Sequence, residues 1–571
     1  MVCCQALASR WLRRLGALSI AAVIGGASAA PPALTPEDAY RQLRQQGRLA
    51  DVTIDGDLDL GRLLQGGEPP EQPAGWRLDA VQLRGKLILR TPTPLRLRIG
   101  NAHLQGGIDF RGCELDRFAL HHSVISGPVR IEDCNLTGPI IRFDFNQFER
   151  ELRLHRVIMT HRPSFRETRF GARAELLACE LATEERPSRA ISFRSASFLG
   201  PALFNNSVFH TNADFRSALF ADDAAFLNVC MPAGAAFRNV HFRGDAEFRF
   251  CTLGRGDFGD RDNLTLFAGR ADFRGCTIDE ARFRFTDFRG ESSFVETRFG
   301  SGGASFAYAN LAGRTDFHGL NSTGPLDLTH AYFPSLSFVW LEIRDAVLAA
   351  TPDLRTLAAL HARAAAAGDT AGRLELEYLL ERERFRLRQA RPLPALTKAP
   401  LAFVEGLVAR LVGITEWLVW GWPTGYGTKL ERILALAAAA WLITWFWLLV
   451  MPGNPVRVKQ QGREQDGGAA LPLYRPLAAA GQHRREPVTR PERLLWSAQL
   501  AFRLLFKVGP RDLRLAVTCE EAAAAGRRLR LLRYGLLSLW LLGSLLLVLL
   551  ALTLANTSPV INQLVGELFP I

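Results

Sequence analysis

Apolar residues between Phe143 and Leu253 recur at steps that alternate between five and six positions, with polar residues between them. One series, spaced by eleven and shifted once by a six-residue insertion, comprises Phe143, Leu154, Phe165, Leu176, Phe193, Phe204, Phe215, Phe226, Phe237 and Phe248. A companion series follows five positions later, at Phe148, Met159, Phe170, Leu181, Phe198, Phe209, Phe220, Met231, Phe242 and Leu253. This ladder has neither the helical nor the simple strand period, and it predicts a repeat fold of stacked coils.

The position two residues before each ladder residue is usually small. Alanine takes it in five consecutive repeats and again later in the chain, at Ala202, Ala213, Ala224, Ala235, Ala246, Ala271, Ala281, Ala304 and Ala309. We therefore expect large and small side chains both to point inward, with the polar residues between them pointing outward. Each coil then buries its apolar faces only by stacking on its neighbours.

Two segments, Ala271-Asp272-Phe273-Arg274-Gly275 and Ala281-Arg282-Phe283-Arg284-Phe285, resemble the unit of the pentapeptide-repeat family. The resemblance spans roughly residues 100–340, and strand-like signal begins at Val52. It implies a β solenoid, a right-handed parallel β-helix, which we place at residues 52–345. The frequent sixth residue departs from the family pattern and leaves the coil shape open. Within the family, the chain resembles the membrane-attached type, which has a C-terminal membrane module of two helices. In this chain, that module resembles a degenerate form of an ion channel.

Helical signals flank the repeats. Thr35-Pro36-Glu37-Asp38 combines an N-cap, an N1 proline and first-turn acids, and it predicts a capping helix within residues 30–51. Residues 353–389 predict an α-helical stalk, assigned to residues 346–391. Residues 401–422 are apolar but contain Glu405, Arg410 and Glu416, so we expect an interfacial amphipathic segment at residues 392–432.

Two uncharged stretches, residues 433–451 and 534–555, are long enough to predict transmembrane helices, with buried core helices as the alternative. Residues 452–533 carry 16 Lys and Arg against 7 Asp and Glu, which predicts a basic cytoplasmic loop. Residues 556–571 form a short tail. Thr424-Gly425-Tyr426-Gly427 is similar to a potassium-channel filter, but it precedes the first predicted span rather than lying between the two.

The first residues carry an export signal. Arg10, Arg13 and Arg14 precede a short apolar run, and Ala27-Ser28-Ala29 fits a cleavage site. These features predict a signal peptide at residues 1–29, with an uncleaved anchor as the alternative. Together with the basic loop, they place the protein in the inner (cytoplasmic) membrane of a bacterium, with the β-helix domain on the periplasmic, outer side.

Cysteine and arginine follow the ladder. Cys113, Cys134, Cys179, Cys251 and Cys276 take the small inward position, which predicts buried free thiols, with disulfides as the alternative. Arginine follows ladder phenylalanines at Arg111, Arg166, Arg194, Arg216, Arg238, Arg243, Arg274 and Arg289. Because residues 101–340 hold 27 Arg and 29 Asp and Glu, we expect these arginines to pair with acids. The alternative is a surface for an anionic polymer or lipid headgroup.

Composition excludes a disordered chain, since apolar residues make up 48% of it, and much of the +12 formal charge lies in the basic loop. No common catalytic or zinc-binding motif occurs, so we predict no enzyme, no catalytic, cofactor-binding or metal residues, and no cofactor. The expected function is a non-catalytic envelope membrane protein that presents a rigid β-helix as a binding and scaffolding surface. The expected partners are the lipid bilayer and an envelope protein or polymer, not nucleic acid. The alternatives are a two-span ion channel or transport module regulated by the exported domain, and a carbohydrate-active β-helix enzyme.

Overall fold

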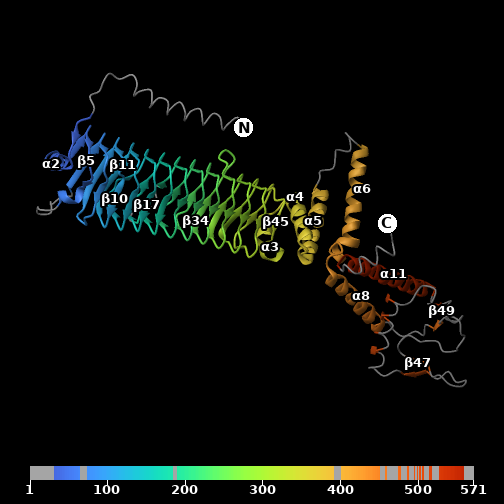
Figure 1. The fold of residues 1–571 in the computed structure, drawn as a ribbon. Coiled ribbons are helices and arrows are strands. Elements are labelled where there is room, and N and C mark those ends of the chain that lie inside the picture. Colours follow the sequence, from blue (N-terminus) through green and yellow to red (C-terminus); the bar gives the residue numbers. More distant parts are fainter. Residues whose placement is uncertain are drawn as a thin grey trace. The chain divides into compact units, whose positions relative to one another are not determined.

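The computed structural model describes residues 31–64, 74–183, 190–390 and 400–450, several short segments between 457 and 516, and residues 526–557. The chain divides into two compact units, Met1–Thr356 and Leu357–Ile571. The first unit is a β solenoid of about 13 parallel coils (Figure 1), which confirms the predicted repeat architecture.

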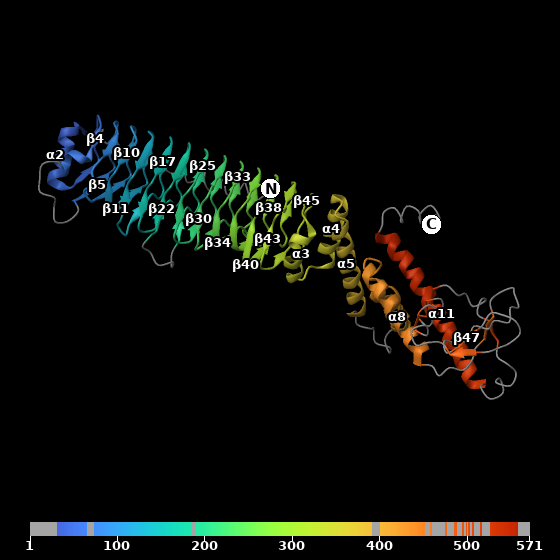
Figure 2. The same cartoon turned by 90° about the horizontal axis from the view of Figure 1, so that it is seen from below.

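Each coil contributes strands to four faces. Two faces are 13-stranded parallel sheets, one running from β1 (Ala33–Leu34) to β41 (Asn310–Leu311) and the other from β4 (Leu58–Asp59) to β45 (Leu336–Ser337). On the other two faces, long strands turn the corner between them, namely β11 (Glu114–His121), β34 (Thr252–Asp257), β37 (Thr277–Arg282) and β40 (Arg298–Ser305). Figure 2 shows the strands in successive rows along the solenoid.

The coil repeats every 22 residues where the ladder is regular, so two eleven-residue steps complete one turn. For example, Phe148 pairs with Phe170, and the Asn228 side chain donates a hydrogen bond to Asn206 of the preceding coil at a separation of 22 residues. The sixth residue that departs from the pentapeptide unit therefore enlarges the coil without breaking its register.

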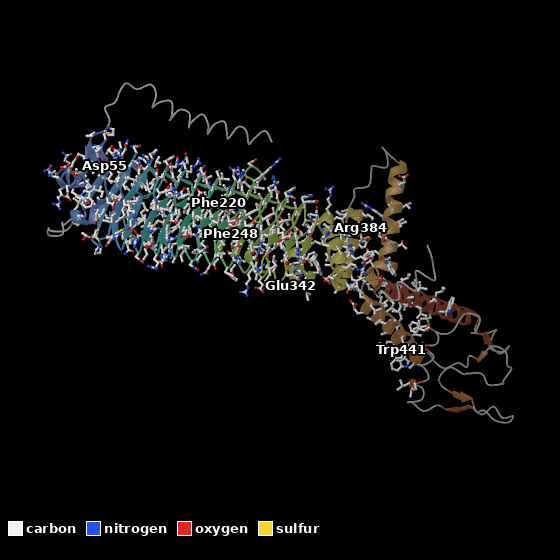
Figure 3. The ribbon with its side chains drawn as sticks, viewed as in Figure 1. Asp55, Phe220, Phe248, Glu342, Arg384 and Trp441 are labelled. Carbon is white, nitrogen blue, oxygen red and sulfur yellow. The ribbon has the colours of Figure 1, made fainter. Side chains whose placement is uncertain are left out.

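The ladder residues form columns of stacked rings inside the solenoid. Phe204, Phe226 and Phe248 are fully buried, and successive ring centroids lie 4.7 Å apart with interplanar angles of 3° and 2°. Phe220, in β28 (Leu219–Phe220), and Phe248, directly after β33 (Ala246–Glu247), belong to different faces and are both fully buried; both are labelled in Figure 3. The small-position alanines are buried beside these rings, so large and small side chains both point inward, as the sequence predicted.

Helices close both ends of the coil stack. The N-terminal helix α2 (Pro36–Gln46) begins at Thr35, whose hydroxyl accepts a hydrogen bond from the Asp38 backbone, and ends at the left-handed Gly47. It buries Ala39, Tyr40 and Leu43. At the other end, α3 (Trp340–Ala349) buries Trp340, Ile343, Ala346 and Val347. These caps cover apolar coil ends that would otherwise face water.

The second unit is mainly helical. Its described elements are α4 (Leu354–Ala367, which begins in the first unit), α5 (Thr370–Ala390), α6 (Pro400–Glu416), a π-helical turn (Trp417–Gly421), α7 (Trp422–Thr424), α8 (Leu430–Val450) and α11 (Gly526–Thr557). It also contains two short antiparallel pairs, β46 (Arg457–Lys459) with β49 (Arg514–Ala516) and β47 (Tyr474–Pro476) with β48 (Arg485–Pro487). Thr424 and Tyr426 of the filter-like sequence are buried in a tight turn, where Gly425, Tyr426 and Gly427 all have positive φ.

The predicted transmembrane helices at residues 433–451 and 534–555 are wrong. Among the described residues, no helix combines the length and the hydropathy needed to cross a membrane. Charged residues lie at the start of both helices, at Glu431 and Arg432 in α8 and at Arg527, Arg528, Arg530 and Arg533 in α11.

Several predicted segments lie outside the described residues. The predicted signal peptide, residues 1–29, is one of them, as are most of the predicted basic loop (452–533) and residues 558–571 of the predicted tail.

The five cysteines of the small inward position are buried free thiols. Cys113 and Cys134 occupy adjacent coils with their sulfur atoms 2.9 Å apart, and the Cys251 thiol donates a hydrogen bond to the Phe226 carbonyl. Burial raises the pKa of Cys179 to about 11, which keeps this thiol neutral at physiological pH. These cysteines act as small core residues rather than as reactive groups.

Truncating a ring in the stack tests the inward assignment. We expect Phe226→Ala to lower the free energy of unfolding by about 3–5 kcal/mol, because it opens a cavity among buried rings. Phe250→Ala is the matched control, since the Phe250 ring is 61% exposed; we expect a loss below about 1 kcal/mol. Guanidinium denaturation followed by circular dichroism measures both. Equal shifts of the two midpoints would contradict the assignment.

Candidate functional site

One corner of the solenoid carries an outward column of side chains. Its members lie two residues after a buried ladder residue, and in most coils they adopt left-handed backbone with φ between 52° and 59°: His122, Phe145, Glu167, Ser195, Ser217, Asn239, Phe285, Tyr308 and His330. Asp260 holds the corresponding place after Phe258 but does not have positive φ. The column is therefore interrupted at Asp260.

An insertion causes this interruption. Between β34 and β35 (Leu266–Phe267) the corner takes residues 258–265, whereas in the next coil, between β37 and β38 (Asp287–Phe288), it takes only residues 283–286. The extra residues form a small loop closed by an antiparallel bridge between Asp260 and Asn263. Gly259 stands at its base, where a Cβ atom would lie 2.7 Å from the Arg284 carbonyl oxygen, so the close approach of the two coils requires glycine.

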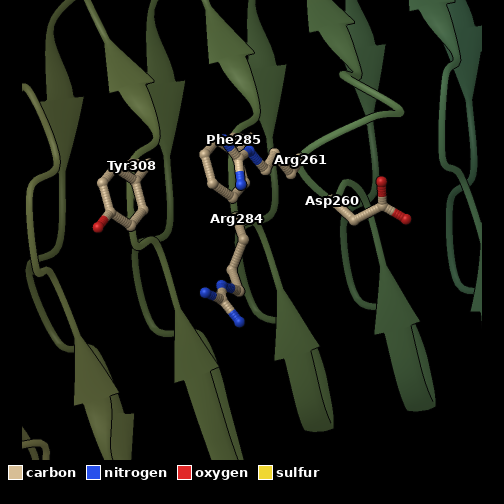
Figure 4. A pocket seen from close by; sticks show the side chains of 5 residues that line it. All are labelled: Asp260, Arg261, Arg284, Phe285 and Tyr308. Atoms are coloured by element: carbon tan, nitrogen blue, oxygen red, sulfur yellow. The ribbon is translucent and has the colours of Figure 1, made fainter.

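The interrupted corner forms a surface recess, which we call the Phe285 recess. It has a volume of about 640 Å³ and is lined by Asp260, Arg261, Arg284, Phe285 and Tyr308 (Figure 4). A second recess of about 400 Å³ shares Asp260 and Arg284 with the first. The two recesses therefore adjoin and extend over neighbouring coils, with volumes in the range of ligand pockets.

Three aromatic side chains stack along one side of the recess. The Phe285 and Tyr308 ring centroids lie 4.9 Å apart at an angle of 2°, and the His330 ring lies 4.9 Å beyond Tyr308. Tyr308 is 48% exposed although it belongs to a regular coil corner. In Figure 4, Phe285 lies between Tyr308 and Asp260, so the ring stack ends at the recess. Asp260 has no ring to continue it.

The loop is held by the Asp260 carboxylate. It accepts hydrogen bonds from the Asp262 backbone (3.0 Å), from the Asn263 backbone (3.0 Å) and from the Asn263 amide (2.8 Å), and it pairs with Arg238 at 3.0 Å. Burial acts to raise the pKa of Asp260, but the hydrogen bonds from Asn263 and Arg238 outweigh it, and the pKa is lowered overall. Burial raises the pKa of Asp257, and Arg238 at 3.3 Å opposes that rise.

Two guanidinium groups at the recess have no acidic partner. Within the described part of the chain, neither Arg261 nor Arg284 forms an ion pair, and both are exposed. Most arginines of the predicted Arg series behave differently, because Arg111, Arg166, Arg216, Arg238 and Arg289 pair with carboxylates. The predicted pairing of arginine with acids thus holds for five of the eight arginines in the series. Arg194, Arg243 and Arg274, like Arg261 and Arg284, form no ion pair within the described residues.

Carboxylates of the adjoining recess are engaged by arginines. Glu280 pairs with Arg282 and lies 3.6 Å from Arg255, and Asp257 and Asp260 share Arg238. In the described residues, no group of three or more His, Cys, Asp or Glu side chains is placed to hold a metal ion. The arrangement offers recognition of a ligand by an aromatic face, guanidinium groups and carboxylate acceptors.

Sequence reasoning named no site residue and missed this recess. The available signal was the ladder itself, whose regular steps stop at Phe258 and resume at Phe267, nine residues later. Phe285 and Tyr308 then lie at corner positions where most coils carry smaller or polar residues. Comparison of the chain with protein-family models, characterised proteins and solved structures finds no match.

The hydrogen bonds and ion pair of Asp260 predict that the stability of the loop depends on pH. Because the pKa of Asp260 is lower in the folded protein, its contribution to loop stability is present above about pH 4 and is lost as the pH falls below it. We expect amide exchange in residues 261–264, corrected for the intrinsic rate, to be constant between about pH 5 and 7 and to accelerate below about pH 4.

Asp260→Asn should accelerate that exchange between about pH 5 and 7, since it removes the charge that pairs with Arg238, and the difference from the wild type should shrink below about pH 4. Asp262→Asn is the matched control because the Asp262 side chain is exposed, and it should leave the exchange near the wild-type rate. Equal exchange in the two variants would show that Asp260 does not hold the loop.

Proposed function

We propose that this protein is a non-catalytic binding scaffold whose solenoid presents the Phe285 recess to an envelope partner. The supporting observation is the interruption of an otherwise regular corner, which places an aromatic stack and two arginines without acidic partners beside a recess. Binding sites commonly combine an apolar surface with a few oriented polar groups. The stacked coils supply a rigid support for these groups.

A binding role is favoured over a catalytic one by the carboxylates. Asp257, Asp260 and Glu280 are each held by arginine, and Asp260 is committed to its own loop. A glycosidase needs one carboxyl group free to give a proton and another free to act as base or nucleophile. The carbohydrate-active alternative therefore draws little support from this groove.

Photo-crosslinking in cells tests the scaffold proposal. A benzoylphenylalanine side chain in place of Tyr308, at the recess, should give a discrete crosslinked product because the partner lies against that ring. The same replacement at Phe250, which is 61% exposed, is the matched control and should give none. Adding Arg284→Ala to the Tyr308 variant should remove the product. Equal products from both positions would contradict a localised binding surface.

We further propose that the second unit associates with a lipid surface through α6. Exposed apolar side chains fall on one stripe of this helix and the turn that follows it: Leu407, Val408, Leu411, Val412, Ile414 and Leu418, which are 41% to 60% exposed. Glu405, Arg410 and Glu416 lie off this stripe. A helix of this kind lies in a membrane interface with its apolar side toward the acyl chains. The signal sequence predicted at residues 1–29 supports an exported location.

Vesicle flotation tests the lipid proposal. We expect the purified protein to float with vesicles of phosphatidylethanolamine and phosphatidylglycerol, and the double variant Leu411→Glu, Val412→Glu to lose most of this binding, because two charges would enter the apolar stripe. Leu341→Glu is the control, since Leu341 is 72% exposed in the first unit. Flotation that is unchanged in the double variant would exclude α6 as the lipid contact.

A further inference from the structure

We propose that the Phe285 recess binds an acidic saccharide chain, one whose sugar rings carry carboxylate or phosphate groups. This inference rests on the proposed scaffold function and names the ligand of the same site. The ligand class follows from the ring, the charges and the open form of the recess.

The aromatic stack supplies an apolar face with partial negative charge. Phe285 ends the stack at the recess, with Tyr308 behind it at 4.9 Å. Such a face attracts the polarised C–H groups of a sugar ring, which has one apolar side and a rim of hydroxyls. Tyr308 is about half exposed, and its hydroxyl can donate or accept a hydrogen bond with that rim.

The two unpaired arginines supply the acidic specificity. Arg284 comes from the same corner as Phe285, and Arg261 comes from the inserted loop of the preceding coil. A guanidinium group binds carboxylate or phosphate through two parallel hydrogen bonds and stays charged at all physiological pH values. An acid group on a sugar that stacks on Phe285 thus has two cations within the same recess.

The adjoining recess disfavours a nucleic acid. It is lined by Asp257, Asp260 and Glu280 as well as by arginines, and residues 101–340 carry slightly more acids than bases. A strand with one phosphate per nucleotide would meet these carboxylates unfavourably. A saccharide carries several hydroxyl groups for each acid group, and those hydroxyls can donate hydrogen bonds to the same carboxylates.

The site is a surface feature that continues over neighbouring coils, since the two recesses share Asp260 and Arg284. This form suits a chain that passes across the corner better than a small molecule enclosed on all sides. The aromatic spacing of 4.9 Å from ring to ring also extends along the solenoid as far as His330.

Calorimetric titration of the full-length protein tests the ligand class. The probes are a short oligogalacturonate, its methyl-esterified neutral form, a phosphorylated oligosaccharide and a single-stranded oligonucleotide. We expect at least one acidic saccharide to bind, and the neutral form to bind at least about tenfold more weakly. The two acidic probes distinguish carboxylate from phosphate recognition.

Phe285→Ala and Arg284→Ala should each weaken binding of the acidic saccharide by about tenfold or more. Their matched controls are Phe145→Ala and Arg194→Ala, which occupy equivalent corner positions in earlier coils and should leave the Kd unchanged. Circular dichroism melts establish that all variants are folded. Because Arg284 is exposed, its variant keeps the test valid should Phe285→Ala disturb the coil.

Equal Kd values for the recess variants and their controls would overturn the inference, as would tighter binding of the oligonucleotide or no binding of either acidic probe. If the Tyr308 photo-crosslink persists in that case, the scaffold proposal stands and only the ligand class falls. If the crosslink is also absent, both fall together.

Discussion

Coil-on-coil stacking of buried phenylalanine rings is the constraint on which the first unit depends. Hydrogen-bonded parallel strands fix the rise between coils at ~4.7–4.9 Å, and the ring centroids of Phe204, Phe226 and Phe248 follow it at 4.7 Å. Because this exceeds the ~3.5–4.0 Å optimum between carbon atoms, parallel rings must be offset, which is an arrangement that aromatic pairs favour. Each coil therefore needs its neighbours, and the ends need the caps that α2 and α3 provide.

This constraint also locates the candidate site. A regular coil leaves no space at its corners, since every corner is built on the one before it. A recess arises where the core rings keep their stacking between coils while the outward column of corner side chains is interrupted. Phe258 and Phe283 still stack at 4.6 Å across the interruption, although the corner between their coils carries the extra loop and Gly259. The core is thus continuous, and the Phe285 recess is confined to the surface.

The sequence predicted the core better than the surface or the second unit. Alternating steps of five and six identify the inward positions because only apolar or small side chains fit inside the solenoid. The ladder residues from Phe143 to Leu253 are all buried, as the pattern predicted. The recess depends on the inserted loop, which has Gly259 at its base and carries Arg261. The periodicity of the ladder predicts neither the close approach at Gly259 nor the position of Arg261. The absence of charge over residues 433–451 and 534–555 predicted spans, but no described helix has the combination of length and hydropathy that a span requires.

The most direct test is to restore the regular corner by deleting residues 261–264, which shortens the interrupted coil to the length of its neighbours. Phe258 and Phe283 should remain stacked, so the guanidinium midpoint of unfolding should stay the same or rise. Crosslinking through Tyr308 and binding of the acidic saccharide should both disappear, because the recess and Arg261 are lost. A folded shortened protein that keeps its partner would contradict the assignment of function to the interruption.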